Sequence, residues 1–213
     1  MSITKNDGIC YLCGNTIRKS GMTTHLKKEV CPAGDVQLCN LLKIEDQYNK
    51  DYWLYLDIPA TSALSSLDRF LRNIWLECCG HMSQFYFPGY DVIGKSQKLG
   101  YMSQGAKLCY DYDFGSTTSL VITCMGQIIR PAQRSAVRLL ARNVPPTFPC
   151  CVCGKNADEV NAAVYPHTFY CEACAKQRED EGYFLPVTNS PRMGECGYCG
   201  ELDKYAYVPK PRG

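Results

Sequence analysis

The sequence is poor in histidine and tryptophan, and its positive and negative charges nearly balance. Its 213 residues include three histidines and two tryptophans, and the formal net charge is +2. Such a balance excludes the broad basic surface of proteins that coat nucleic acid, so any nucleic-acid contact has to be local. A glycine-rich phosphate loop and the HExxH motif are also missing, which excludes the nucleotide-binding and protease sites built on them.

Long apolar runs are missing as well. The opening stretch MSITKNDGICYLC contains no apolar signal segment, and no later run is long enough to span a bilayer. We therefore expect a cytoplasmic protein without a membrane partner. Cysteine, in contrast, is abundant, with fifteen copies. In a reducing compartment these thiols are expected to bind metal ions rather than to form disulfides.

The first group of metal-ligand residues lies near the N-terminus. Cys10 and Cys13 form the knuckle CYLCG, and His25 and Cys31 complete the spacing Cys-x2-Cys-x11-His-x5-Cys. This spacing is similar to that of a Cys2His2 zinc finger whose last ligand is cysteine. Four ligands fill the tetrahedral shell of zinc, so the expected role of the ion is structural. We assign residues 1–45 to this finger.

Four basic residues of the finger are candidates for nucleic-acid contact: Arg18, Lys19, Lys27 and Lys28. A single finger covers about three base pairs, which is too few for useful specificity alone. Phosphate contact and docking onto a protein are both consistent with this surface.

The central part of the chain has the pattern of an α+β domain. Residues Leu64 to Phe87 read as an amphipathic helix that leads into a strand. Strands are predicted at Tyr52 to Ile58, Lys107 to Gly115 and Ser119 to Met125. We predict a central mixed sheet packed on a helix over residues 46–144, flanked by two small zinc-binding modules.

Three stretches of this domain carry a resemblance to a known family: YWLYLDIP, LDRFLRNIWLECCGHMSQF and LCYDYDFGS. They resemble the plasmid open-reading-frame-three-like family of the pRiA-plasmid type, which is often described as transposon-passenger or resolvase-like. The resemblance covers about residues 46–145. It implies an α+β fold with helices on a sheet and an association with mobile elements.

A catalytic alternative rests on His81 and nearby carboxylates. With Glu77, Asp111 and Asp113, this histidine could bind a metal ion or activate water in a hydrolase or nuclease. The spacing of these residues is weak evidence, because alternating aspartates are typical of a solvated strand and DFG before a Ser-Thr-rich stretch is typical of a turn. The sequence favours a non-catalytic protein.

A connector rich in arginine follows the central domain. Arg130, Arg134, Arg138 and Arg142 recur every four residues, and they share a face on either a helix or a strand. We therefore predict that Arg134, Arg138 and Arg142 are a second candidate surface for phosphate contact.

The last module, residues 145–213, has the spacing of a four-cysteine zinc ribbon. Its predicted ligands are Cys150, Cys153, Cys171 and Cys174, with Cys151 as an alternative first ligand. A further pair, Cys196 and Cys199, has no evident partner pair in the sequence. It could recruit His167 or bind across a dimer, but we expect it to hold no metal. The cofactor prediction is therefore two structural zinc ions.

These features favour a zinc-stabilised, non-catalytic binding protein, namely a nucleic-acid-associated accessory protein of mobile-element or plasmid type. A protein-interaction adaptor is the alternative, and a metal-dependent hydrolase or nuclease using His81 is the second alternative.

Overall fold

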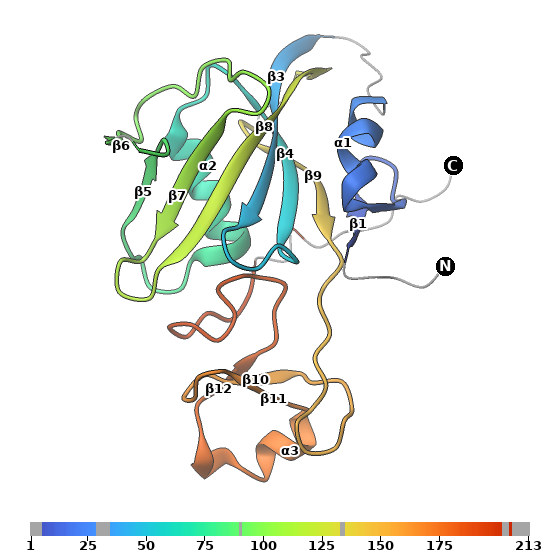
Figure 1. Cartoon of the computed structure of the whole chain (residues 1–213), viewed down its shortest axis with the longest axis vertical. Helices are drawn as coiled ribbons and strands as arrows, with labels where there is room; N and C mark the ends of the chain where they lie inside the picture. The colour runs from blue at the N-terminus through green and yellow to red at the C-terminus, as the bar shows by residue number, and fades with distance from the viewer. Residues whose placement is uncertain (1–5, 29–34, 90, 133–134, 202–204, 206–213) are drawn as a thin grey trace.

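The computed structural model describes residues 6–28, 35–89, 91–132, 135–201 and Tyr205. Over these residues the fold is α+β, with one large sheet and few helices (Figure 1). This confirms the predicted class. Among the described helices, none combines the length and the apolar character needed to cross a membrane.

The described part of the chain forms a nine-stranded sheet in the order β2-β1-β9-β4-β3-β8-β7-β5-β6. The strands are β1 (Asp7–Cys10), β2 (Thr16–Arg18), β3 (Val36–Asp46), β4 (Trp53–Pro59), β5 (Ser83–Tyr86), β6 (Val92–Ile93), β7 (Lys107–Tyr112), β8 (Thr118–Pro131) and β9 (Arg138–Asn143). All of its pairings are antiparallel, which corrects the expectation of a mixed sheet. Parallel neighbours need a long crossover, whereas short connections join β3 to β4 and β7 to β8.

One face of the sheet is covered by the predicted amphipathic helix. Helix α2 (Leu64–Leu71) continues into a π-helical turn, η1 (Arg72–Leu76), and lies behind β7 and β8 in Figure 1. Leu67, Phe70 and Leu71 join the main core with side chains of β3, β4, β7 and β8. The apolar stripe read from the sequence is therefore the face that packs against the sheet.

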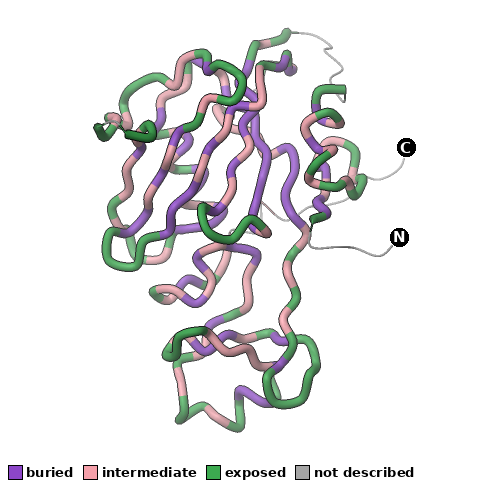
Figure 2. Tube along the Cα trace, in the orientation of Figure 1, coloured by how far each residue is buried: buried purple, intermediate pink, exposed green. Residues whose placement is uncertain are grey.

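The other face is covered in part by the N-terminal helix, α1 (Lys19–Lys28). Met22 and Leu26 are fully buried in a second core with Trp53, Tyr55 and Leu140. In Figure 2 the longest buried stretch of the large sheet lies on β4, whose side chains belong to both cores. Since β1 also pairs with β9, the sheet extends into the segment that the sequence assigned to a separate finger.

The strand near the middle of the sheet is one that sequence reasoning did not predict. Strand β3 pairs with β4 along one edge and with β8 along the other. It spans Val36–Asp46 and therefore crosses the boundary that the sequence suggested at residue 45.

The last module has its own small sheet, in the order β11-β10-β12. Its elements are β10 (Glu159–Asn161), β11 (Thr168–Tyr170), α3 (Glu172–Lys176), the 3-10 turn η2 (Glu179–Glu181) and β12 (Phe184–Pro186). The chain then returns to the central domain, where the Oγ of Ser190 donates a hydrogen bond to the carbonyl of Trp75.

Candidate metal centres

The first two candidate centres begin with knuckles that have the same backbone structure. In the first, the N–H of Gly14 donates to the carbonyl of Cys10 at 2.7 Å, and in the second the N–H of Gly154 donates to the carbonyl of Cys150 at 2.9 Å. Both glycines have positive φ, 78° and 73°. A side chain at this position would strain the backbone, so glycine after the second cysteine allows the turn that directs both thiols to one side.

The N-terminal centre is assembled from a strand, a turn and a helix. Cys10 ends β1, Cys13 lies on the turn, and His25 lies in the last turn of α1. The Sγ of Cys13 is 3.3 Å from the Nε2 of His25, and the donor atoms of the three residues lie within 4.8 Å of one another. Burial raises the pKa of Cys10 to about 11, so a cation is needed to hold this thiol as a thiolate near neutral pH.

The predicted fourth ligand of this centre, Cys31, lies outside the described residues. The described part of the chain therefore supplies three of the four predicted donors. These three are residues that the sequence predicted.

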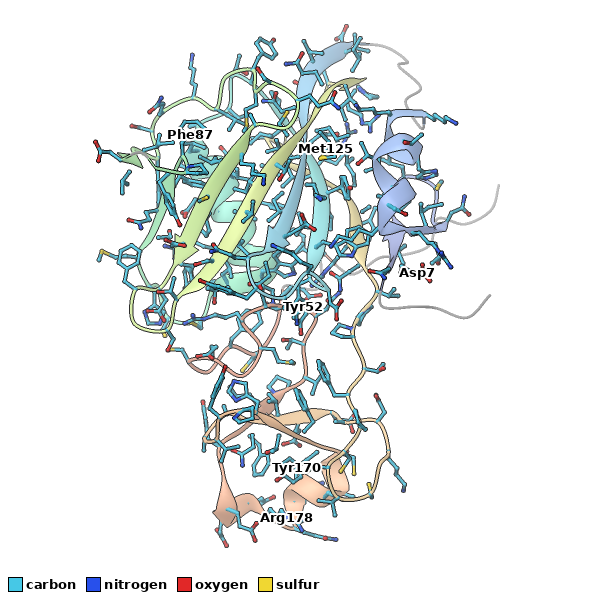
Figure 3. The ribbon with its side chains drawn as sticks, viewed as in Figure 1. Asp7, Tyr52, Phe87, Met125, Tyr170 and Arg178 are labelled. Atoms are coloured by element: carbon cyan, nitrogen blue, oxygen red, sulfur yellow. The ribbon has the colours of Figure 1, made fainter. Side chains whose placement is uncertain are left out.

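The C-terminal centre brings together all four predicted cysteines. The sulfur atoms of Cys150, Cys153, Cys171 and Cys174 lie within 4.8 Å of one another, and Cys151 is not in the group. Cys153 and Cys171 have sulfur atoms 3.6 Å apart. The ring of Tyr170 packs against this group, and Figure 3 labels it in the lower module beside sulfur atoms.

At the C-terminal centre, the pKa values of Cys150 and Cys174 are shifted in opposite directions. Burial disfavours the thiolate of Cys150, but backbone N–H groups that point at its sulfur outweigh this and lower its pKa to about 6. A hydrogen bond with Cys171 and the other neighbouring thiols raises the pKa of Cys174 to about 12. A bound divalent cation would allow all four to ionise together.

A third group was not predicted. Cys78, Cys79, His81 and Cys196 have donor atoms within 4.8 Å of one another. Cys199 is not part of the group, and its thiol points to the carbonyl of Gly197 at 3.3 Å. Cys196 therefore meets residues that follow η1, and not the second cysteine of its own apparent knuckle or His167. The string CCGH was a local signal of metal-ligand residues, but the sequence contains nothing that places Cys196 beside it.

Of the carboxylates in the catalytic alternative, Asp113 lies beside His81, whereas Asp111 and Glu77 contact other side chains. The Nδ1 of His81 lies 3.6 Å from Oδ1 of Asp113. Asp111 instead accepts a hydrogen bond from Ser119, and Glu77 forms an ion pair with Arg72. Because the Nε2 of His81 faces the thiols of Cys79 and Cys196, its surroundings suit metal ligation better than water activation.

The arginine stripe of the connector is not a shared exposed face. The pairing of β4 with β9 shifts by one residue between Ala141 and Leu139, and one extra residue on a strand turns later side chains to the opposite face. Arg138 donates to Asp57 at 2.7 Å, while the buried Arg142 donates to Glu201 at 2.7 Å. Arg134 lies outside the described residues.

The basic residues of the finger divide into two groups. Lys19 forms an ion pair with Glu45 at 2.7 Å and donates to the carbonyl of Lys50. Arg18, Lys27 and Lys28 are exposed, and within the described residues no carboxylate forms an ion pair with them.

Comparisons with known proteins do not assign the chain to a family. No family model matches it, and no curated protein matches it. Among solved structures, the crystal structure of the protein of unknown function MM3350 from Methanosarcina mazei Go1 is similar, with 11% sequence identity and a TM-score of 0.40. That alignment covers 49% of this chain and 67% of the other.

Proposed function

We propose that the protein is a zinc-stabilised, non-catalytic binding protein whose N-terminal module contacts nucleic acid. The donor chemistry supports zinc, since thiols and imidazoles make up the three groups and soft sulfur ligands favour zinc over magnesium or calcium. Four thiolates at the C-terminal centre would leave no open position for a substrate, which supports a structural role.

One observation carries the nucleic-acid part of the proposal. Arg18, Lys27 and Lys28 are exposed on one small module and are free of ion pairs with described carboxylates. Other basic residues that the sequence offered, such as Arg138 and Arg142, are engaged by internal carboxylates. The proposed contact surface is therefore the outer side of α1 and the end of β2. A role in a plasmid or mobile element is supported by the sequence resemblance alone.

Binding to labelled duplex DNA and to single-stranded RNA across a salt series tests this proposal. The triple variant R18Q/K27Q/K28Q should lower the slope of log affinity against log salt by up to about 2.7 on duplex DNA, since each lost phosphate contact contributes about 0.9. The matched control is K98Q/K107Q/K155Q, which removes the same charge from three exposed lysines outside the N-terminal module.

An equal loss of salt slope in the two variants would show that net charge alone causes the effect, and it would contradict a contact surface on α1. An absence of binding by the wild type at low salt would contradict the nucleic-acid proposal and favour the protein-interaction adaptor.

One observation supports the protein-interaction adaptor as a second candidate. Leu38 and Ile129 are cross-strand neighbours on β3 and β8, and their side chains are 41% and 47% exposed beside the 48% exposed Val36.

A further inference from the structure

The third group joins two parts of the chain that are far apart in the sequence. Cys196 lies 117 residues after Cys79 and 115 residues after His81. Its sulfur is nevertheless 3.3 Å from the sulfur of Cys79 and 3.1 Å from the Nε2 of His81. Cys79 lies 3.1 Å from the same nitrogen and 3.8 Å from the sulfur of Cys78.

These separations are close to those of ligands around one tetrahedral ion. Sulfur at about 2.3 Å and nitrogen at about 2.0–2.1 Å from zinc lie about 3.4–3.8 Å from one another. The sulfur atoms of Cys153 and Cys171, in the predicted ribbon centre, are 3.6 Å apart. A disulfide is a poorer description of the group, because S–S bonds are about 2.05 Å long and leave the imidazole without a role.

The surroundings of the group match those of a metal site. Asp113 lies 3.6 Å from the Nδ1 of His81, on the side of the ring away from the sulfur atoms. A carboxylate behind a histidine ligand fixes the ring and strengthens the metal bond. The guanidinium of Arg192 lies 3.8 Å from the sulfur of Cys78, where it would offset the negative charge that three thiolates leave on a divalent ion.

Backbone strain is concentrated at the same place. Among the described non-glycine residues, positive φ occurs at Asp113 (61°) and Cys196 (46°). Such conformations cost free energy and persist where the surrounding contacts require them. Here one strained residue supplies a donor atom to the group and the other supports its histidine.

The segment that carries Cys196 is docked around the group by several contacts. Arg192 is fully buried and forms an ion pair with Asp113 at 2.5 Å. Its guanidinium also lies 5.2 Å from the ring centre of Tyr112. The hydroxyl of Tyr198 donates to the carbonyl of Ile74 at 3.4 Å. These contacts hold residues 190–198 against the end of η1 and of β7.

We propose that Cys78, Cys79, His81 and Cys196 bind a third zinc ion, which fastens the segment after the ribbon to the central domain. Asp113 is a positioning residue for His81, and Cys199 is not a ligand. The site encloses a loop of more than a hundred residues, so the ion would bring the return segment and the central domain together. This inference is independent of nucleic-acid binding.

Zinc content of purified protein, measured by elemental analysis under reducing conditions, provides the test. The variant C196S should hold one ion fewer than the wild type, while its matched control C199S should hold the same number as the wild type. Because the Cys79 side chain is exposed, C79S is a second variant that should fold and should also lose one ion. In a competition with a chelator, D113N should release one ion at a roughly 10–100-fold lower chelator concentration than the wild type does.

A second measurement separates loss of the ion from general unfolding. Trp75 lies in η1, beside the docked segment, and its carbonyl accepts the bond from Ser190. Proteolysis within residues 187–201 should become faster in C196S and in C79S, while the cooperative fluorescence melt is kept. Equal zinc contents in C196S, C199S and wild type would overturn the proposal. So would a disulfide between Cys79 and Cys196, which peptide mapping of wild-type protein prepared without reductant would identify.

Discussion

The N-terminal module, residues 7–28, and the ribbon module, residues 149–187, use the same knuckle in different settings. In the N-terminal module, β1 pairs with β9 of the large sheet, and Met22 and Leu26 are part of a core shared with Trp53. In the ribbon module, β10 pairs with β11 and β12, and the buried cysteines pack with Tyr170 of the same module.

This difference teaches that ligand spacing predicts a metal site without predicting how strongly the site is coupled to the rest of the fold. In the N-terminal module one candidate metal ligand, His25, lies on the helix that packs on the large sheet. Loss of a bound ion should therefore lower the stability of the sheet. In the ribbon module the proposed ion would stabilise a small separate sheet. Both tryptophans, Trp53 in β4 and Trp75 in η1, lie in the central part, so their fluorescence reports the stability of the large sheet.

The sharpest test of the comparison is the pair C13S and C153S. Each removes the exposed second cysteine of its knuckle, and each should cost one bound zinc ion. Structural zinc contributes about 10 kcal/mol or more to the folding of small zinc modules, while a whole domain has a stability of about 5–15 kcal/mol. We expect C13S to lower the denaturant midpoint of the tryptophan transition strongly and C153S to leave it nearly unchanged.

Equal shifts in the two variants would show that the modules are coupled to the sheet to the same degree. Zinc analysis of each variant is the control, since the comparison is valid only where both have lost one ion.

The second test removes the charge that ties α1 to the sheet. Asp57 is fully buried and accepts from Arg130 and Arg138, and Arg130 in turn donates to the carbonyl of Leu26 at 3.1 Å. The variant D57A would leave the buried Arg130 without its counter-ion, which costs about 3–5 kcal/mol. Urea unfolding followed by tryptophan fluorescence measures the loss.

The control E172A removes an exposed carboxylate of the ribbon module and should leave the transition unchanged. A D57A transition like that of the control would contradict a stabilising role of the buried pair between Asp57 and Arg130.

Much of this architecture could be predicted because it depends on local periodicity. The apolar stripe of α2, the strands β4, β7 and β8, and the paired cysteines at positions 150 and 153 are encoded within short windows. Strand β3 was missed because its residues were assigned to the finger, although they pair with β4 and β8 at the middle of the sheet.

The missed features depend on contacts between distant segments. Arg138 and Arg142 have the predicted spacing of four, but a one-residue shift in the pairing of β9 turns their side chains to opposite faces. Arg138 pairs with Asp57, and Arg142 pairs with Glu201. Cys196 similarly has a neighbour of suitable spacing, Cys199, and yet lies beside Cys79. Spacing describes what a segment can do alone, whereas these side chains are placed by the return of the chain to the central domain.

The smallest expected effect comes from adding one methyl group to each module. In G8A, the new Cβ would lie 2.6 Å from the carbonyl oxygen of Arg142 and would collide with the ring of Trp53. Since Gly8 lies in β1, opposite Asn143 of β9, either the strand pairing or the tryptophan has to move, and overpacking of this kind costs about 1–3 kcal/mol. In G154A, the space around the new Cβ is open, but φ of 73° imposes a backbone cost of about 1–2 kcal/mol. The two costs are similar in size and differ in place, so urea unfolding followed by tryptophan fluorescence should shift in G8A and stay constant in G154A. Amide hydrogen exchange in β10, β11 and β12 should become faster in G154A and stay constant in G8A. A shift of the tryptophan transition in G154A as large as that in G8A would mean that the ribbon module and the large sheet unfold as one unit, and the contrast between the two modules would then be wrong.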